Sequence, residues 1–354
     1  TMSMSSRGAD DDRSLRARRR RSGGSVCALR GVLAVATATA ALLAPRCAEA
    51  FAAAPRFLIA SSPATSTIAY IQLPGDRVGP RPGEAMRVLV SKGLTFPQGI
   101  AVDAYRHFLY VADPSLGKLV RYKLRPSNDA LSVGKQQDVA SPVEVRAVAV
   151  DGMGNVWFTD EANQRVLRVS AKQLEEGHRT PQVVYDGSVV PEVRSPGGLA
   201  VDNFFVYWLN KAQGKTAGSL VKAKQNPSAA LASFNASATT QSGTVHPLAS
   251  NAEKCYGTCI ALGNMFYTDE FNKLYGVPRT AIARGEVVTV SDSFKEPRGC
   301  TYDGDSTVYV ADKAANAIYM FAANMEQLRP DRPVGLAAEL QGAFGVAVYT
   351  LLNT

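Results

Sequence analysis

Two Glu-x-Arg triplets, Glu144–Arg146 and Glu296–Arg298, are the groups of this chain best suited to binding an acidic ligand. Arginine carries a planar fork of N–H donors that matches the oxygens of a carboxylate or a phosphate. Two arginines facing each other would therefore form a clamp for an anion. Alternatively, each Glu pairs with its own Arg or with a neighbour and ties down a loop. The elements that position the triplets decide how they are interpreted.

A pair of apolar strands separated by a polar turn recurs five times along the chain. The first strand begins at a small residue, and the second, rich in Val, Tyr, Phe and Trp, ends in Asp or Asn. The five copies begin at Gly99, Ala147, Gly198, Cys259 and Gly299. Gly, Asn and Asp fill the turns, as tight hairpins require. A repeat of about 40 to 60 residues that is all β in pattern predicts a radial array of small sheets.

The two ends of the array supply complementary halves of a sixth unit. Phe57–Ser61 matches only the second strand, and Gly345–Tyr349 matches only the first. Pairing them would close a ring and protect the strand edges. We therefore predict an all-β, six-bladed β-propeller of four-stranded antiparallel blades whose terminal strands share one blade. The blades are expected near residues 57–73 with 343–349, 97–124, 145–169, 196–224, 257–278 and 297–322.

The segment Met153–Arg168 resembles an NHL repeat, and the units are more loosely similar to the YWTD repeats of LDL-receptor-type propellers and to the senescence-marker/gluconolactonase family. The resemblance runs from about Phe57 to Tyr349. It implies a TolB-like, six-bladed propeller. It implies no single activity, because these families include binding scaffolds, lyases and lactonases.

The residue before each inner strand is expected to face the mouth of the central channel. The six residues so placed are Gln98, Arg146, Gly197, Thr258, Arg298 and Phe344. Arg146 and Arg298 fall three blades apart, on opposite sides of a six-bladed ring. The resemblance to gluconolactonases implies Asn, Asp and Glu metal ligands at such positions. None of the six is an Asn or a carboxylate, so we predict no metal and no cofactor.

These features favour a non-catalytic binding module for a protein or a small anionic ligand. We expect its site to comprise Glu144, Arg146, Glu296, Arg298, Gln98 and Thr258. The alternative is a propeller hydrolase or lyase, gluconolactonase-like or strictosidine-synthase-like, with ionisable groups supplied by loops. Candidates for those groups are Glu161, Asp269 and Glu270. We assign no catalytic residue, and no histidine falls at a repeated ring position.

An acidic or amide residue ends the second strand of every complete unit. The series is Asp113, Asp160, Asn210, Asp269 and Asp312. A ring of carboxylates could be catalytic, but a residue of this type that precedes a tight turn usually accepts backbone N–H groups. We therefore predict structural turns at these positions.

Residues 1–50 are predicted to be a secretory signal or targeting region, and residues 51–354 a single propeller domain. Arg16–Arg21 is basic, Val32–Ala44 is apolar but too short to span a bilayer comfortably, and Ala48–Ala50 fits a cleavage site. Phe51 is similar to the residue that leads the bipartite signals of algae with secondary plastids. The expected location is the secretory pathway or outside the cell, and the alternative is a plastid.

The net charge limits the kinds of binding partner that we expect, and the cysteine content limits the possible disulfides. Residues 1–50 carry nine Arg, three Asp and one Glu, a net of +5 out of +8, so the remainder has only +3 and no nucleic-acid footprint is expected. We expect a monomer with no transmembrane span in the mature chain. Of the remaining cysteines, Cys255 could pair with Cys259 across a Tyr-Gly turn, or Cys259 with Cys300 across two blades.

The period is broken by an insertion at 225–252, which we expect to be a long, disordered surface insertion in the fourth blade. It is rich in small polar residues, contains the glycosylation sequon at Asn235, and ends near a candidate outer strand at Thr244–Leu248.

Overall fold

The computed structural model describes residues 54–75, 78–214, 217–227, 245–281, 286–323 and 327–352. The chain divides into two compact units, Thr1–Phe51 and Ala52–Thr354, and every strand below belongs to the second. The predicted targeting region and the sequon at Asn235 lie outside the described residues.

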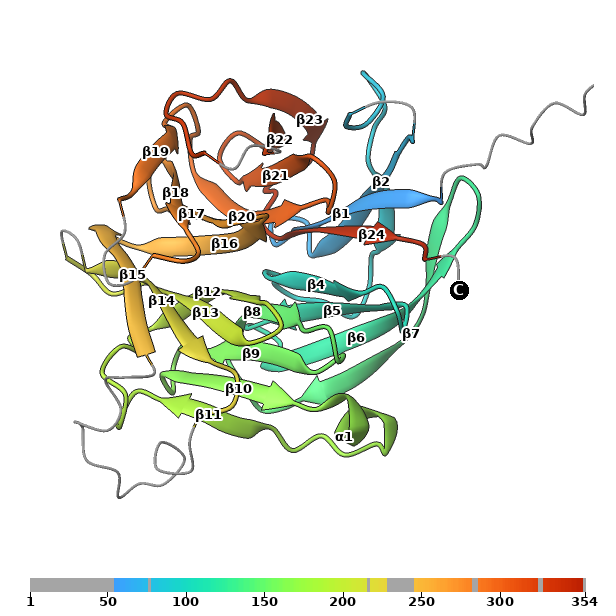
Figure 1. Cartoon of the computed structure of the whole chain (residues 1–354). Helices are drawn as coiled ribbons and strands as arrows, with labels where there is room; N and C mark the ends of the chain where they lie inside the picture. The colour runs from blue at the N-terminus through green and yellow to red at the C-terminus, as the bar shows by residue number, and fades with distance from the viewer. Residues whose placement is uncertain are drawn as a thin grey trace, which may run out of the picture. The chain divides into compact units, whose positions relative to one another are not determined.

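Six four-stranded antiparallel sheets form the blades of a propeller (Figure 1). Five blades take their strands consecutively from the chain, innermost strand first. Blade 2 contains β4 (Ile100–Asp103), β5 (Phe108–Asp113), β6 (Lys118–Pro126) and β7 (Leu131–Ala140). Blade 3 contains β8 (Val145–Val150), β9 (Val156–Asp160), β10 (Arg165–Val169) and β11 (Gln182–Asp186). Blade 4 contains β12 (Pro196–Val201), β13 (Phe205–Asn210), β14 (Gly218–Lys224) and β15 (Val245–Ala252). Blade 5 contains β16 (Cys255–Ala261), β17 (Asn264–Asp269), β18 (Leu274–Pro278) and β19 (Val288–Ser291). Blade 6 contains β20 (Pro297–Tyr302), β21 (Thr307–Asp312), β22 (Ala317–Ala322) and β23 (Gly335–Glu339).

Blade 1 joins the two ends of the propeller. Its innermost strand is β24 (Val346–Thr350), followed by β1 (Arg56–Ser62), β2 (Thr67–Leu73) and β3 (Arg87–Val90). The red β24 lies beside the blue β1 in Figure 1, with Phe57 opposite Tyr349 in the register. The predicted fold class, including closure by the terminal strands, is confirmed.

Helix is almost absent from the described chain. The helix α1 (Ala171–Glu175) lies between β10 and β11 and is capped by the Ser170 hydroxyl, which accepts from the backbone N–H of Gln173. Among the described residues no helix is both long and apolar enough to cross a membrane.

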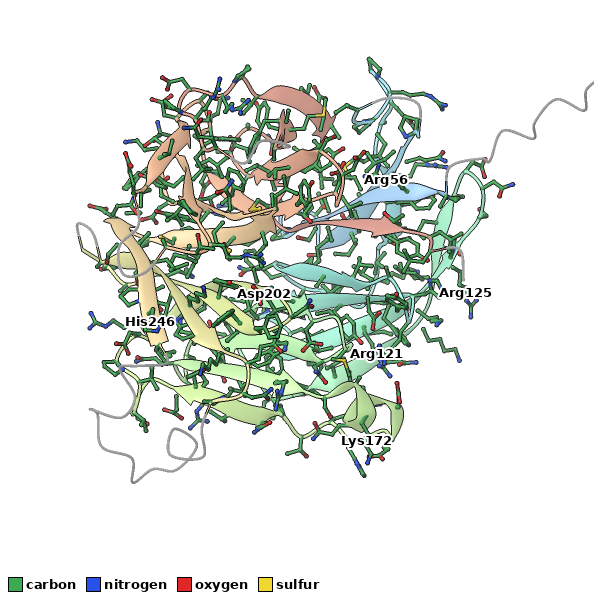
Figure 2. All side chains as sticks on the ribbon, viewed as in Figure 1. Arg56, Arg121, Arg125, Lys172, Asp202 and His246 are labelled. Atoms are coloured by element: carbon green, nitrogen blue, oxygen red, sulfur yellow. A yellow bond between two sulfur atoms is a disulfide. The ribbon has the colours of Figure 1, made fainter. Side chains whose placement is uncertain are left out.

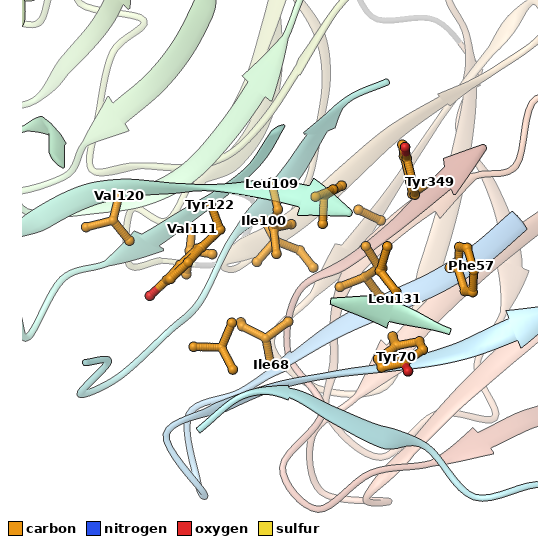
Figure 3. Packing of buried hydrophobic residues seen from close by; sticks show 14 residues of the cluster. Phe57, Ile68, Tyr70, Ile100, Leu109, Val111, Val120, Tyr122, Leu131 and Tyr349 are labelled. Atoms are coloured by element: carbon orange, nitrogen blue, oxygen red, sulfur yellow. The ribbon is translucent and has the colours of Figure 1, made fainter. Parts of the chain in front are cut away.

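The hydrophobic core consists of six clusters, one between each pair of neighbouring blades. Figure 3 shows the cluster between blades 1 and 2, where Phe57 of β1 and Tyr349 of β24 share an apolar layer with Leu109 and Tyr122 of blade 2. The Phe57 and Tyr349 rings stack with centroids 6.4 Å apart. Residues from both ends of the propeller thus contribute to one buried apolar cluster, which stabilises the closed ring.

The inner strands are tied together where they begin. Hydroxyl groups of Ser61, Thr159 and Thr268, in blades 1, 3 and 5, each accept from a backbone N–H of their own inner strand. Each also donates to a backbone carbonyl of the next blade, those of Gln98, Gly197 and Arg298 respectively. In blades 2 and 6 the N–H groups of Gly99 and Gly299 donate directly to the next blade, at 3.2 and 2.8 Å. These bonds fix the rim of the channel.

Candidate functional site

The channel mouth is formed by one residue from each blade, just before the small residue of the inner strand. The glycines at this position lie so close to the next blade that an added Cβ would meet the backbone carbonyl of its mouth residue, for example Arg146 at Gly99, Tyr256 at Gly198 and Arg298 at Gly257. The six mouth residues are Gln98, Arg146, Gly197, Tyr256, Arg298 and Phe344.

The sequence-based placement of Thr258 at the mouth is wrong, and Tyr256 holds that position. Cys255 pairs with Asp269 just as Val145 pairs with Asp160, and the next residue of each inner strand reaches the mouth. Thr258 lies two residues deeper, and its hydroxyl donates to the carbonyl of Phe266 at 2.9 Å. The fifth hairpin is shorter than the others, since only Leu262 and Gly263 lie between paired residues. An alignment that superimposes this turn on the turns of the other blades therefore places the inner strand of blade 5 two residues out of register.

Arg146 and Arg298 lie in opposite blades, and each pairs with the Glu of its own triplet. Glu144 contacts Arg146, and Glu296 contacts Arg298. The Arg146 side chain is 25% exposed, whereas that of Arg298 is only 5% exposed. The two arginines are therefore not an equivalent clamp, because a ligand can reach Arg146 much more readily.

Lys211 adds a third cation that the repeat pattern did not reveal. It follows β13, and its side chain fills the space above Gly197, where an added Cβ would meet its Cδ at 2.7 Å. The ammonium group donates to both carboxylate oxygens of Glu161 at 2.9 Å. Arg146 shares that carboxylate, with Nε 2.5 Å from Oε2. Glu161 thus bridges cations from blades 3 and 4.

The Arg298 side chain packs against its neighbours and is largely inaccessible to a ligand. Its guanidinium carbon lies 4.0 Å from the centre of the Tyr256 ring, and Nη1 donates to the carbonyl of Pro297. Lys211 lies 5.1 Å from the same ring centre. Lys313 shares Glu296 with Arg298, at 3.2 Å. Tyr256 therefore joins the cations of blades 4 and 6 at the rim.

Burial and like charge act on the ionisable groups of this cluster. Desolvation lowers the pKa of Lys211, Glu161 counteracts this, and the neighbouring Arg146 and Arg298 lower it further. Burial also raises the pKa of Tyr256, although Arg298 opposes that change. The Lys211 ammonium is therefore repelled by neighbouring arginines, and an additional anion bound nearby would offset this repulsion.

A cavity of about 70 Å³ is lined by the mouth residues Arg146, Tyr256 and Phe344 and by residues of the inner strands, among them the predicted site residue Thr258. Pockets for whole small molecules are usually about 300 Å³ or more. Only a single functional group could enter here, so a larger ligand would be held at the rim.

Gln98 and the loop carboxylates contribute less to the mouth. Gln98 is buried, and its carbonyl accepts the Ser61 hydroxyl. Glu270 pairs with Lys254 at 2.9 Å, and the buried Asp269 accepts from the backbone N–H groups of its own turn. Of the three loop carboxylates, Glu161 belongs to the cation cluster described above, and Glu270 accepts from the hydroxyl of the mouth residue Tyr256 at 3.5 Å. Within the described ranges, no three His, Cys, Asp or Glu side chains are grouped so that they could hold a metal ion.

The series of residues that end the second strands makes backbone contacts. Asp113, Asp160 and Asp312 each accept from a backbone N–H three residues ahead. Asp113 and Asp312 also accept from the segments that lead into their own inner strands. Asn210 differs, since its amide oxygen accepts from the N–H of Arg194. These contacts hold the loops that surround the mouth.

Of the two disulfides that the sequence left open, Cys255–Cys259 is wrong and the alternative, Cys259–Cys300, is confirmed. Cys255 and Cys259 lie on one strand, β16, so the Tyr-Gly pair between them forms an irregularity in the strand and no reversing turn. Cys259 and Cys300 lie on neighbouring inner strands with Cα atoms 5.5 Å apart, within the usual disulfide range. Cys255 is a buried free thiol.

No protein-family profile matches the chain, and no curated protein matches it in sequence. Solved structures do match in fold. A chain of the nidogen/laminin complex has a TM-score of 0.61 at 14% identity, covering 84% of this chain and 99% of that one. A gluconolactonase from Xanthomonas campestris has a TM-score of 0.53 at 12% identity, covering 82% and 87%. Regucalcin, a calcium-binding protein from Agrobacterium tumefaciens, has a TM-score of 0.50 at 12% identity, covering 72% and 79%.

The chain shares the propeller fold of these proteins. At such identities the likeness concerns fold alone. The similar structures include both a protein–protein complex and an enzyme, so the fold does not choose between binding and catalysis.

Proposed function

We propose that this propeller is a non-catalytic binding module whose channel mouth takes an acidic group of a protein partner or of a small anionic ligand. The observation that carries the proposal is the sharing of Glu161 by Arg146 and Lys211. Two cations from different blades converge on one carboxylate, so the position already suits carboxylate oxygens. A ligand carboxylate at the rim would complete the same geometry.

The charge balance of the cluster supports this proposal. Arg146, Lys211, Arg298 and Lys313 carry four positive charges, against three negative charges on Glu144, Glu161 and Glu296. One positive charge is left over in a partly buried setting, where an anion gains more than it would in open water. Arg146 and Lys211 would contact the ligand, while the buried Arg298 would hold Tyr256 in place.

The disulfide supports an oxidising location. Cys259–Cys300 joins two blades, and such bonds persist mainly in secreted proteins and oxidising compartments. We therefore keep the secretory pathway as the proposed location and the plastid as the alternative. A fold-level analogy agrees with partner binding, since a chain of the nidogen/laminin complex has the same architecture.

Calorimetric titration with citrate and with a hexaglutamate peptide tests the proposal. Arg146→Gln and Lys211→Met should each weaken binding by about tenfold or more, the effect of losing one charged hydrogen bond in a desolvated site. The matched control is Arg125→Gln, which removes the same charge from the exposed Arg125 on β6, labelled in Figure 2. Binding of neither probe, or equal weakening by the control, would contradict the proposal.

The enzymatic alternative has a separate test. The folded chain is assayed for hydrolysis of glucono-1,5-lactone with calcium or zinc added. Turnover that is lost in Glu161→Gln but kept in the Arg125→Gln control would replace the binding proposal with a hydrolase. No turnover, together with citrate or peptide binding at Arg146, supports the binding module.

A further inference from the structure

A second hollow lies at the opposite end of blade 4 from the channel mouth. The inner strand β12 begins near the mouth at Pro196 and ends at Val201, and the hollow opens beside the turn that follows it. Its volume is about 310 Å³, within the range of small-molecule sites. It is lined by Asp202–Phe205 and Tyr207, by Lys222 of β14, and by Arg279 and Thr280, which follow β18 in blade 5. Figure 2 labels Asp202.

Two cations converge on this hollow from adjacent blades. Arg279 contacts the Asp202 carboxylate at 3.1 Å, and Lys222 donates to the Arg279 carbonyl at 3.0 Å. Lys222 also lies 4.2 Å from the centre of the Phe205 ring. Desolvation lowers the pKa of Lys222, with Asp202 opposing and Arg279 reinforcing this change. The lysine is thus held in position without a carboxylate partner of its own among the described contacts.

The Asp202 carboxylate already accepts hydrogen bonds from the protein on both of its oxygens. Asp202 accepts from the backbone N–H groups of Phe204 and Phe205, from the Tyr207 hydroxyl and from Arg279. It orders the turn and fixes Arg279, so it offers little to a ligand. Lys222 and Arg279 together leave one net positive charge at the hollow.

An aromatic side chain stands exposed beside these cations. Phe204 is 73% exposed, although it lies in a tight turn where Gly, Asn or Asp would be usual. Because Phe204 also lines the hollow, its exposed ring offers an apolar face directly beside the two cations. A planar ring could stack on it while an attached anionic group reaches Lys222 and Arg279.

We propose that this hollow binds an anionic group carried on a planar ring, as in an aryl phosphate or an aryl carboxylate. The ring lies against Phe204, and the oxygens lie between the Lys222 ammonium and the Arg279 guanidinium. The site is separate from the mouth and does not depend on the function proposed for it.

Calorimetric titration with phenyl phosphate, benzoate and inorganic phosphate provides the test. Phenyl phosphate or benzoate should bind at least about tenfold more tightly than inorganic phosphate, because only the aryl probes use Phe204. Phe204→Ser should abolish that preference, and Lys222→Met should weaken both aryl probes by about tenfold. Whichever aryl probe binds more tightly identifies the anionic group.

Matched controls keep the test specific. Met153→Ser changes another exposed apolar residue, 75% exposed, in the corresponding turn of blade 3 and should leave affinity unchanged. Arg146→Gln at the mouth should also have no effect. No aryl preference, equal weakening by Met153→Ser, or an unaltered affinity in Lys222→Met with an unchanged melting temperature would overturn the inference.

Discussion

The guanidinium of Arg298 lies over the ring of Tyr256, 4.0 Å from its centre, and the two residues hold the same register position in adjacent blades. Their strands are also joined by the Cys259–Cys300 disulfide. The rim between blades 5 and 6 is therefore stabilised by a covalent bond, a cation–π contact and the ion pair between Arg298 and Glu296. Across the ring, Arg146 is more exposed and more available to a ligand.

Arg298→Met should destabilise the fold more than Arg146→Met does. The first change removes a buried cation from Tyr256 and leaves Glu296 with Lys313 alone, for a loss of about 2 kcal/mol. The second affects a partly exposed pair and should cost less than about 1 kcal/mol. Urea unfolding at neutral pH measures both. Equal losses would show that the two arginines are equivalent after all.

Two mouth-proximal glycines should differ sharply when changed to alanine. At Gly257 the added Cβ would meet the backbone carbonyl of Arg298, so Gly257→Ala should cost about 3 kcal/mol of stability. At Gly197 its two nearest neighbours would be atoms of the flexible Lys211 side chain, and the backbone carbonyl of Cys255 would lie further away at 3.3 Å, so Gly197→Ala should cost less than about 1 kcal/mol. Gly197→Ala should nevertheless weaken citrate binding, because it displaces Lys211 from Glu161. Thermal unfolding and calorimetry separate these effects, and a stable Gly257→Ala would contradict this reading of the rim.

The propeller could be predicted from the sequence because its signals repeat. Alternating apolar residues, β-favouring second strands and polar turns recur in every blade, and the two chain ends supply halves that match. The register of blade 5 could not be read in the same way. Side chains in a strand alternate with period two, so a two-residue shift leaves Thr258 and Tyr256 on the same face with the same pattern. Two features of the sequence indicate the shift, namely the shortened turn at Leu262 and the glycine at position 257, where Gly99 and Gly299 stand in other blades.

Lys211 was missed for a different reason. It directly follows the last residue of β13, and its N–H donates to the carbonyl of Ser195 just as the N–H groups of Glu161 and Lys313 donate to the carbonyls of Glu144 and Glu296. The position therefore repeats between blades, but the type of side chain at it does not. The Lys211 side chain occupies the space above Gly197. Gly197, a glycine at a position where other blades carry Arg, Tyr or Phe, was the available signal. The choice between the two possible disulfides likewise required the knowledge that β16 stays extended through Tyr256 and Gly257.

Loss of the disulfide should lower stability by about 4 kcal/mol, the chain-entropy value for a sequence separation of 41 residues. The double change Cys259→Ala with Cys300→Ala tests this by urea unfolding. Dithiothreitol should destabilise the natural chain and leave the double variant unchanged. Cys255→Ala is the control, since it keeps the bond and its sensitivity to reductant. A reductant effect that persists in the double variant would show that the loss comes from another source.

Stability should fall as the pH rises above about 9, because buried acids must ionise when the chain unfolds. Burial raises the pKa of the Cys255 thiol and of the phenols of Tyr185 and Tyr309, and raises that of Tyr122 to about 12. Between its unfolded and folded pKa, each group keeps its proton in the folded chain and loses it in the unfolded chain. Its stabilisation is therefore complete at lower pH and is lost as pH rises, by at most about 1.4 kcal/mol per pH unit for each group.

Lys211 acts in the opposite direction, since its lowered pKa makes stability rise with pH up to the ordinary lysine value. Lys222, whose pKa is also lowered by burial, acts in the same direction as Lys211. The buried phenols and the Cys255 thiol outnumber these two amines, so the net slope should be negative. Urea unfolding between about pH 8 and pH 11 measures that slope. Tyr309→Phe should make it shallower by up to about 1 kcal/mol at the alkaline end, with little change at neutral pH. A free energy of unfolding that stays constant or rises above pH 10 would show that the phenols titrate normally in the folded chain.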